Sequence, residues 1–212
     1  MEITNQQITD FAEAFSTQED TLLAEIAQFT YAQHAEPHML SGHLQGQILK
    51  MLSYMVRPKR ILEIGTFTGY SALCLAEGLQ EDGILHTIES RPETSEIAHN
   101  FFLKSPLYTK IKLHTGNAID IIPTLQEYWD LVFIDADKVG YIDYFKLILP
   151  HIRKNGFILA DNIFFHGRIF EENPKGKSAK AVKEFNKFIQ QRTDIEKVVL
   201  TIRDGLYLLR KM

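Results

Sequence analysis

The sequence contains a single cysteine, Cys74, among 212 residues. An intrachain disulfide is therefore impossible, and a metal cluster held by several thiolates is excluded as well. The chain also lacks any apolar run near the roughly 18 residues that a membrane-spanning helix needs. Met1 leads into a polar stretch rather than a basic segment followed by an apolar one, so no secretion signal is recognised. We expect a cytoplasmic protein that does not enter a membrane.

An excess of positive charge is absent too. The 23 Lys and Arg residues are outnumbered by 27 Asp and Glu residues, and the formal net charge is −4. Such a chain has no overall attraction to nucleic acid or to an anionic membrane. Lys180, Lys183 and Lys187 recur at helical spacing, which we interpret as a solvated helix face, with an RNA contact as the alternative.

From residue 60 onward, short apolar strands alternate with helices. The expected strands are 60–64, 84–88, 111–114, 130–134, 157–160, 197–202 and 206–209. Strands separated by helices predict a parallel sheet with right-handed crossovers and helices on both faces. Only Arg203-Asp204-Gly205 joins the last two strands, which is hairpin length, so this pair must be antiparallel.

The N-terminal part has helical periodicity instead. The spacing of Ser16 and Glu19 predicts a capping box that opens a helix, and Ser90 with Glu93 predicts a second one after the second strand. Length and composition suit one α/β domain with a sizeable core. We therefore predict a single domain over 1–212, with a helical part at 1–57 and a doubly wound α/β core at 58–212.

A turn with two glycines follows the first core strand. Gly65 and Gly69 would let a ligand approach the backbone closely. A dinucleotide fold needs a further glycine at the position of Phe67, so the loop favours an adenosyl ligand without a pyrophosphate and disfavours a nicotinamide dehydrogenase. Glu89 ends the second strand and can accept hydrogen bonds from both ribose hydroxyls. A plain turn with a surface glutamate is the alternative, and Glu63 could either contact the ligand or hold neighbouring backbone.

Acidic residues follow two buried strands. Asp135 and Asp137 come directly after 130–134, and Asp161-Asn162 comes after 156–160. Open α/β sheets bind ligands at the carboxyl ends of their strands, and neighbouring strands would bring Asp135 and Asp161 together. Two carboxylates and an amide oxygen form a hard site suited to Mg²⁺, with Mn²⁺ or Ca²⁺ also possible. The alternative is structural: acidic residues are common at strand ends and at the start of loops. That alternative explains each residue alone but explains the pair less well.

Lys138 lies three residues after Asp135. A partly desolvated lysine beside a metal has a lowered pKa and can serve as a base. A solvated lysine at the start of a helix is the alternative interpretation.

Together these segments resemble the cation-dependent class I O-methyltransferases, the family of catechol O-methyltransferase and the caffeoyl-CoA O-methyltransferases. The resemblance spans about residues 39–210. Its most specific pieces are 133–138 followed by Asp161-Asn162, and the loop 62–71. The family has a Rossmann-like sheet of seven strands whose last strand is antiparallel, in agreement with the pattern above.

The resemblance implies S-adenosylmethionine as the methyl donor and a divalent cation bound by Asp135, Asp161 and Asn162. It implies Lys138 as the catalytic base. Glu89 would hold the ribose, Gly65 and Ser71 the methionine part, and Asn117 with Ala118 the adenine. The full set implied to contact the donor is Met39, Ser41, Glu63, Gly65, Phe67, Tyr70, Ser71, Glu89, Ser90, Asn117, Ala118, Asp135 and Asp137. A homodimer is also implied.

The implied reaction is methyl transfer to a hydroxyl of a small aromatic diol of the catechol type. Val198 stands where the animal catechol enzymes have a glutamate that orients the second hydroxyl, and Pro37-His38 stands where they have a tryptophan. The segment 164–170 is expected to line the acceptor site.

Two rival functions remain at this point. Some family members methylate a hydroxylated tRNA base, 5-hydroxyuridine, by the same chemistry, and the net charge of −4 argues against that alternative. A binding protein without activity is disfavoured because the expected metal residues and Lys138 are all present.

Overall fold

A computed structural model of the chain describes residues 6–212. The polar stretch that argued against a secretion signal lies, in its first five residues, outside the described residues. No helix within residues 6–212 has the length and apolar character needed to cross a membrane.

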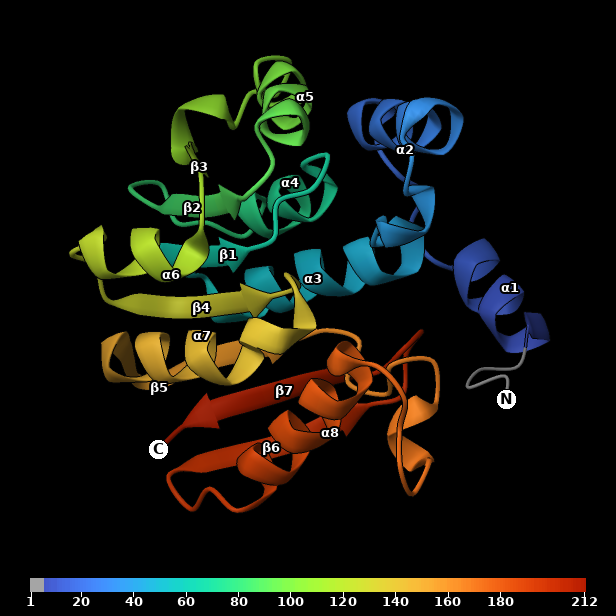
Figure 1. The fold of residues 1–212 in the computed structure, drawn as a ribbon. Coiled ribbons are helices and arrows are strands. Elements are labelled where there is room, and N and C mark those ends of the chain that lie inside the picture. The colour runs from blue at the N-terminus through green and yellow to red at the C-terminus, as the bar shows by residue number, and fades with distance from the viewer. Residues whose placement is uncertain (1–5) are drawn as a thin grey trace.

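The predicted strands form one seven-stranded sheet in the order β3-β2-β1-β4-β5-β7-β6 (Figure 1). The strands are β1 Arg60–Ile64, β2 Ile84–Glu89, β3 Ile111–Thr115, β4 Trp129–Ile134, β5 Ile152–Ala160, β6 Ile195–Leu200 and β7 Leu206–Lys211. β1 to β5 pair in parallel, whereas β7 is antiparallel to both β5 and β6. The predicted fold class and the antiparallel final pair are confirmed. Because chain order reverses between β1 and β4, a crevice opens there at the carboxyl ends of the strands.

Helices cover both faces of this sheet (Figure 1). They are α1 Gln6–Phe15, α2 Thr21–Gln33, α3 Gly42–Val56, α4 Tyr70–Ala76, α5 Pro92–Phe102, α6 Ala118–Ile121, α7 Tyr141–Ile148 and α8 Lys177–Gln190. Alternate residues of β4 face opposite sides. Leu131 and Phe133 pack in a core shared with α2 to α5, and Val132 and Ile134 pack in a second core with α6 to α8. The central strands β1, β2 and β4 are therefore buried on both faces, whereas most of the edge strand β6 is exposed.

Both predicted capping boxes are wrong. α2 begins at Thr21, where the Asp20 side chain accepts a hydrogen bond from the Leu23 amide at 2.9 Å. Ser16 instead donates its hydroxyl to the Ala12 carbonyl at the end of α1, because that helix ends beside it. α5 has no side-chain cap, and Pro92 occupies its first turn. A proline there has no amide hydrogen to satisfy, so the cap that we predicted is dispensable.

Candidate active site

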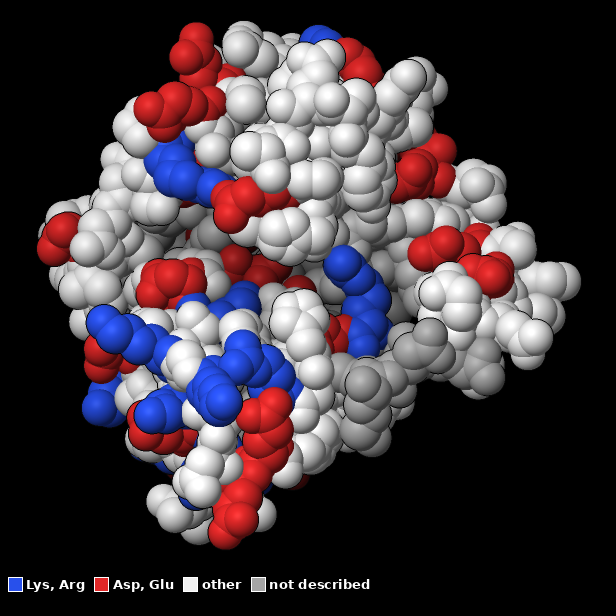
Figure 2. Space-filling model, turned by 45° about the vertical axis from the view of Figure 1, so that its right-hand side comes forward, with Lys and Arg blue, Asp and Glu red and all other residues white. Residues whose placement is uncertain are grey.

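A cavity of about 880 Å³ opens at the carboxyl ends of the central strands. Six carboxylates line it but only three Lys or Arg side chains do: Glu36, Glu89, Asp135, Asp137, Asp161 and Asp204 against Arg91, Lys138 and Arg203. Figure 2 shows acidic atoms inside a hollow of the surface, with Lys and Arg side chains gathered below it. The excess of carboxylates makes the cavity suited to a ligand that carries positive charge.

All but one of the residues predicted to form the site line this cavity. They are Met39, Ser41, Gly65, Phe67, Tyr70, Ser71, Glu89, Ser90, Asn117, Ala118, Asp135, Asp137, Lys138, Asp161 and Asn162. These positions span β-strand ends, helix starts and the segment before α3, so the fold brings together residues that are up to 123 positions apart (162 minus 39).

Glu63 is the exception. Its side chain is fully buried in β1, below the cavity wall, and accepts a hydrogen bond from the Thr87 hydroxyl. Burial raises the pKa of Glu63 to about 8, although hydrogen bonds from Ser71 and Thr87 act in the opposite direction. Of the two interpretations that the sequence left open, its position fits the one in which Glu63 holds its neighbours rather than touching a ligand.

The turn after β1 depends on glycine at its first position. Gly65 has a φ of +104°, and a Cβ there would lie 2.3 Å from the Asp135 carbonyl oxygen. Only glycine lets the β1 turn approach the end of β4 this closely. The same turn is tied to β2, because the Phe67 amide donates to Glu89 Oε2 at 2.8 Å.

Glu89 is held from a second side by Arg91. Its Oε1 atom accepts hydrogen bonds from the Arg91 amide at 3.0 Å and from Arg91 Nε at 3.2 Å. Arg91 Nη1 also reaches Glu36 Oε2 at 2.6 Å. A carboxylate has about four acceptor sites, and Phe67 and Arg91 use three of them, so Glu89 keeps capacity for one further donor while these bonds hold its orientation.

Other predicted residues also have structural partners. Asn117 caps α6 by accepting from the Ile119 amide at 3.0 Å. Asp137 accepts from the Gly140 amide at 3.0 Å and from the Tyr144 hydroxyl. Tyr70 borders the cavity, but its hydroxyl donates to Glu19, which does not line it. These bonds preorganise the walls around the cavity.

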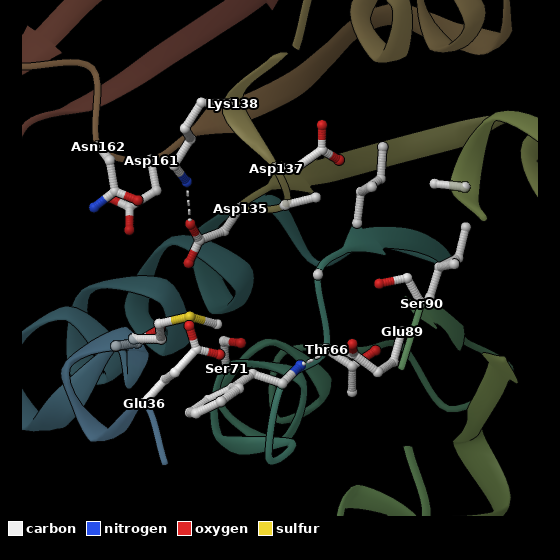
Figure 3. Close-up of a pocket in the computed structure, with 18 of the residues that line it drawn as sticks. Glu36, Thr66, Ser71, Glu89, Ser90, Asp135, Asp137, Lys138, Asp161 and Asn162 are labelled. Atoms are coloured by element: carbon white, nitrogen blue, oxygen red, sulfur yellow. Dashed lines mark hydrogen bonds and ion pairs between the residues drawn. The ribbon is translucent and has the colours of Figure 1, made fainter. Parts of the chain in front are cut away.

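The expected metal-binding residues meet at one end of the cavity (Figure 3). β4 and β5 are in register there, with Ile134 opposite Ala160, and the Asp161 amide donates to the Ile134 carbonyl at 3.0 Å. Asp161 is 3% exposed. Asn162 has a φ of +55°, a left-handed conformation that asparagine tolerates better than most residues.

This donor set fits a hard divalent cation. Within residues 6–212, no group of three or more His, Cys, Asp or Glu side chains is arranged to hold a metal, so the candidate set rests on two carboxylates and one amide oxygen. Burial raises the pKa of Asp135, and repulsion from Asp161 adds to the effect while Lys138 opposes it. A cation between two such carboxylates would relieve that repulsion.

Lys138 contacts the end of β4 and the first residue of α7. Its ammonium lies 2.8 Å from Asp135 Oδ1 and 2.7 Å from the Tyr141 hydroxyl. Burial is the largest single influence and would lower the pKa of Lys138, but Asp135, Tyr141 and Asp161 together outweigh it, and the pKa is raised. The lowered pKa expected from the sequence was that of a lysine beside a bound metal, where the carboxylate has another cationic partner, and it stays a prediction.

Several lining residues were not anticipated from the sequence as site residues, among them Glu36, Arg91, Tyr144, Ser178, Arg203 and Asp204. Arg91 is two residues from Glu89, and Asp204 occupies the hairpin turn, so local signals existed for these two. Nothing in the local sequence around Glu36 or Ser178 points to the cavity, because the packing of distant elements brings them there.

Only part of the segment 164–170, which we expected to line the acceptor site, lies at the cavity. Phe165 and His166 of the predicted segment line the cavity, and so does His38. Phe170, at the end of that segment, is 62% exposed and lies elsewhere. Val198 is 49% exposed on β6 and does not line the cavity.

The lysine stripe of α8 lies on the surface. Lys180, Lys183 and Lys187 are outside the cavity, and Lys183 donates to backbone carbonyls of Glu171 and Glu172. This position fits a solvated helix face that secures the preceding loop.

Comparison with known proteins identifies a family for this chain. The model of the O-methyltransferase family matches residues 13–212. A catechol O-methyltransferase of Niastella koreensis is 33% identical over 187 residues, which cover 86% of this chain and 84% of the relative. Caffeoyl-CoA O-methyltransferase 2 of Populus trichocarpa is 30% identical over 206 residues, covering 92% and 83% respectively.

Solved structures agree. The methyltransferase PaMTH1 of Podospora anserina, solved with S-adenosylhomocysteine, has a TM-score of 0.90 at 28% identity and covers 98% of this chain and 94% of its own. The O-methyltransferase TomG of Streptomyces achromogenes, solved with S-adenosylmethionine, has a TM-score of 0.89 at 28% identity, with 97% and 96% covered. A family model that matches nearly the whole chain, together with these relatives, shows that the protein belongs to the O-methyltransferase family.

Proposed function

We propose that this protein transfers a methyl group from S-adenosylmethionine to a hydroxyl of a small aromatic diol of the catechol type, with the help of a divalent cation. The observation that carries the proposal is one cavity with two differently equipped ends. Asp135, Lys138 and Asp161 gather at one end, and Glu89, bound by the Phe67 amide, lies toward the other. The names of the two relatives above support the same class of acceptor.

The donor would lie along the β1 turn. Glu89 would accept a hydrogen bond from the ribose, and its bonds to Phe67 and Arg91 hold it in position for this contact. Ser71 and Gly65 would contact the methionine part, and Asn117 with Ala118 would border the adenine. The sulfonium and ammonium charges of the donor match a cavity rich in carboxylates.

Asp135, Asp161 and Asn162 are the residues that would hold the cation. When bound, a divalent cation there would lower the pKa of an acceptor hydroxyl and orient it by chelation. Mg²⁺ is the first choice for an all-oxygen set, with Mn²⁺ and Ca²⁺ as alternatives.

Lys138 would take the proton from the acceptor. Its amine reaches the Asp135 carboxylate and the Tyr141 hydroxyl, so it lies beside the end of the cavity where the acceptor oxygen must sit. As long as the carboxylate attracts it, the amine keeps its own proton; Lys138 can act as a base once Asp135 has a different cationic partner. The remaining acceleration would come from alignment of oxygen, methyl and sulfur, which can contribute up to about 10 kcal/mol.

The acceptor would enter beside Phe165 and His166, which line that end of the cavity. Two adjacent hydroxyls on a ring can chelate one cation, whereas a lone phenol offers a single oxygen and cannot chelate it. Val198 is exposed and does not line the cavity. We therefore expect that its side chain does not select which of the two acceptor hydroxyls is methylated. Both meta and para products should form.

The proposal is tested by product analysis on caffeic acid and on its monohydroxy analogue, with S-adenosylmethionine and Mg²⁺. We expect turnover of the diol and little turnover of the phenol. Equal rates on both would remove the chelation argument. No turnover of any catechol, together with methylation of hypomodified tRNA, would favour the 5-hydroxyuridine alternative.

A further inference from the structure

Residues Glu36 to Ser41 lie in the link between α2 and α3 and border the cavity; we call this segment the strap. It contains a short 3₁₀ turn at Pro37–Met39. Five of its six residues line the cavity: Glu36, His38, Met39, Leu40 and Ser41. Two of these, Met39 and Ser41, belong to the proposed donor site, so the position of the strap sets one wall of that site.

Arg203 holds the far end of the strap from the β6–β7 hairpin. Its guanidinium donates to the Ser41 carbonyl, to the Leu40 carbonyl at 3.0 Å and to Gln45 Oε1 at 2.9 Å. Leu40, Ser41 and Gln45 are all at most 6% exposed. Hydrogen bonds from a charged donor to buried acceptors are among the stronger ones in proteins, so the link is substantial.

The backbone at Arg203 is unusual for such a residue. Its φ is +45°, in the left-handed region where a glycine would be unstrained. The hairpin therefore carries a conformational cost that glycine would avoid. The turn conformation alone would favour glycine at this position. The arginine is explained by the hydrogen bonds of its guanidinium to Leu40, Ser41 and Gln45.

The hairpin that carries Arg203 also belongs to the acceptor side. Asp204, the next residue, lines the cavity and accepts a hydrogen bond from the His166 amide at 2.7 Å. The carbonyls of Asp204 and Gly205 accept from Phe164 and Ile163 in the loop after Asn162. One hairpin thus contacts the acceptor wall through Asp204 and the donor wall through Arg203.

The near end of the strap is anchored separately. Arg91 Nη1 binds Glu36 Oε2 at 2.6 Å, and the same guanidinium binds Glu89. This pair is about 40% exposed on both partners, whereas the acceptors of Arg203 are buried. Water weakens an exposed ion pair, so we expect Arg203 to be the stronger anchor.

We propose that Arg203 is a positioning residue that fixes the donor wall to the acceptor wall, so that the two halves of the cavity are held at one spacing. The inference rests on the proposed methyl transfer and adds a residue to it. In-line displacement depends on the distance and angle between the acceptor oxygen and the donor methyl, and a displacement of about 1 Å can cost on the order of 100-fold in rate. Without the guanidinium, the Leu40 and Ser41 carbonyls and Gln45 would lose their donor.

Arg203→Gly is the sharpest test, because glycine relieves the backbone strain while it removes the guanidinium and its three hydrogen bonds. Arg57→Gly is the matched control: Arg57 is exposed, has a φ of +50° at the end of α3 and does not line the cavity. Arg203→Lys keeps one charge and should restore part of the effect. The measurements are the Kd of S-adenosylmethionine by calorimetry without acceptor, kcat at saturating donor and catechol, and the melting temperature.

For Arg203→Gly we expect the donor Kd to rise by roughly tenfold, as loss of a charged hydrogen-bond donor implies. We also expect kcat to fall by at least about tenfold, since lost alignment persists at saturation. Arg203→Lys should lie between, and Arg57→Gly should match the unaltered protein in both. A lower melting temperature with unchanged Kd and kcat would mean a merely structural role and overturn the proposal. A protein that binds no S-adenosylmethionine before any substitution would instead overturn the proposed function.

Discussion

The Lys138 ammonium lies 2.8 Å from Asp135 Oδ1 and 2.7 Å from the Tyr141 hydroxyl, which in turn donates to the Asp161 carbonyl at 3.0 Å. This chain of contacts joins the ends of β4 and β5, the two strands that carry the proposed metal ligands. The amine is a cation while Asp135 is its partner. A cation that binds Asp135 would compete with the Lys138 ammonium for the same carboxylate. Cation binding and proton acceptance by Lys138 would therefore affect each other.

The first prediction separates the base from the charge at this position. Lys138→Ala should lower kcat by roughly 10²–10⁴-fold, the range for loss of a general base. Lys138→Arg should be almost as slow, because arginine retains the positive charge beside Asp135 but does not give up its proton. Steady-state rates at saturating substrates measure both variants.

Lys180→Ala, on the exposed face of α8, is the control for that series and should keep the original kcat. Near-normal turnover by Lys138→Arg would show that Lys138 serves as a charge and not as a base.

The second prediction concerns the cation. Asp161→Asn should weaken Mn²⁺ binding by at least tenfold, as expected when one charged ligand of a small hard site is lost, and should abolish most turnover while leaving donor affinity nearly unchanged. Mn²⁺ binding is measured by electron paramagnetic resonance, which does not depend on activity. Asp143→Asn, at an exposed position of α7, is the control and should bind Mn²⁺ like the unaltered protein. Full activity in the presence of EDTA would contradict the metal assignment.

The third prediction concerns Glu89. Glu89→Gln should raise the Kd of S-adenosylmethionine by at least about tenfold, because charge-assisted hydrogen bonds to the ribose become neutral ones. The KM for the acceptor should change little, since Glu89 lies at the donor end of the cavity. Calorimetry measures the donor affinity. Glu93→Gln, exposed in the first turn of α5, is the matched control, and an equal affinity of the two variants would remove Glu89 from the site.

The fourth prediction concerns stability in mild acid. His86 is 5% exposed, and its Nδ1 atom lies 3.0 Å from His114 Nε2. Burial, with His114 and Lys112 adding to it, lowers the pKa of His86 to about 4. The unfolded chain takes up this proton near pH 6.5 and the folded chain does not, so the contribution to stability is complete above about pH 6.5 and is lost as the pH falls toward about 4.

His86→Gln should therefore flatten the fall of the unfolding free energy between pH 6.5 and pH 4, by up to about 1.4 kcal/mol per pH unit. Urea unfolding at several pH values measures this slope. His99→Gln, on the exposed side of α5, should leave the slope unchanged. Identical slopes for the two variants would show that His86 titrates normally in the folded protein.

Much of the fold follows from local patterns in this sequence. The short, nearly continuous apolar runs of β1, β2 and β4 predict their strands within a residue or two, because a parallel sheet covered by helices buries both sides of its strands. The link between the last two strands was expected at 203–205 and spans 201–205 in the structure; either length leaves no room for a crossover, so the antiparallel pair follows from length alone. Asp135 and Asp161 could be expected together because each directly follows a strand and the two strands are neighbours.

Other features needed the tertiary structure. No local pattern says that β7 inserts between β5 and β6, or that Asp20 rather than Ser16 caps α2. The direction of the Lys138 pKa depends on a 2.8 Å contact, and a change of one or two ångströms would alter the balance between burial and attraction.

Glu63 and Arg203 illustrate the difference between local sequence patterns and tertiary contacts. Both are polar residues at the end of a strand or in a turn, and the sequence pointed to the first as a site residue. The folded chain buries Glu63 beneath the cavity and brings Arg203 across 163 positions to the Leu40 carbonyl. Periodicity and loop length act between near neighbours and can be recognised in the sequence, whereas contacts between distant segments arise only when the whole core is packed.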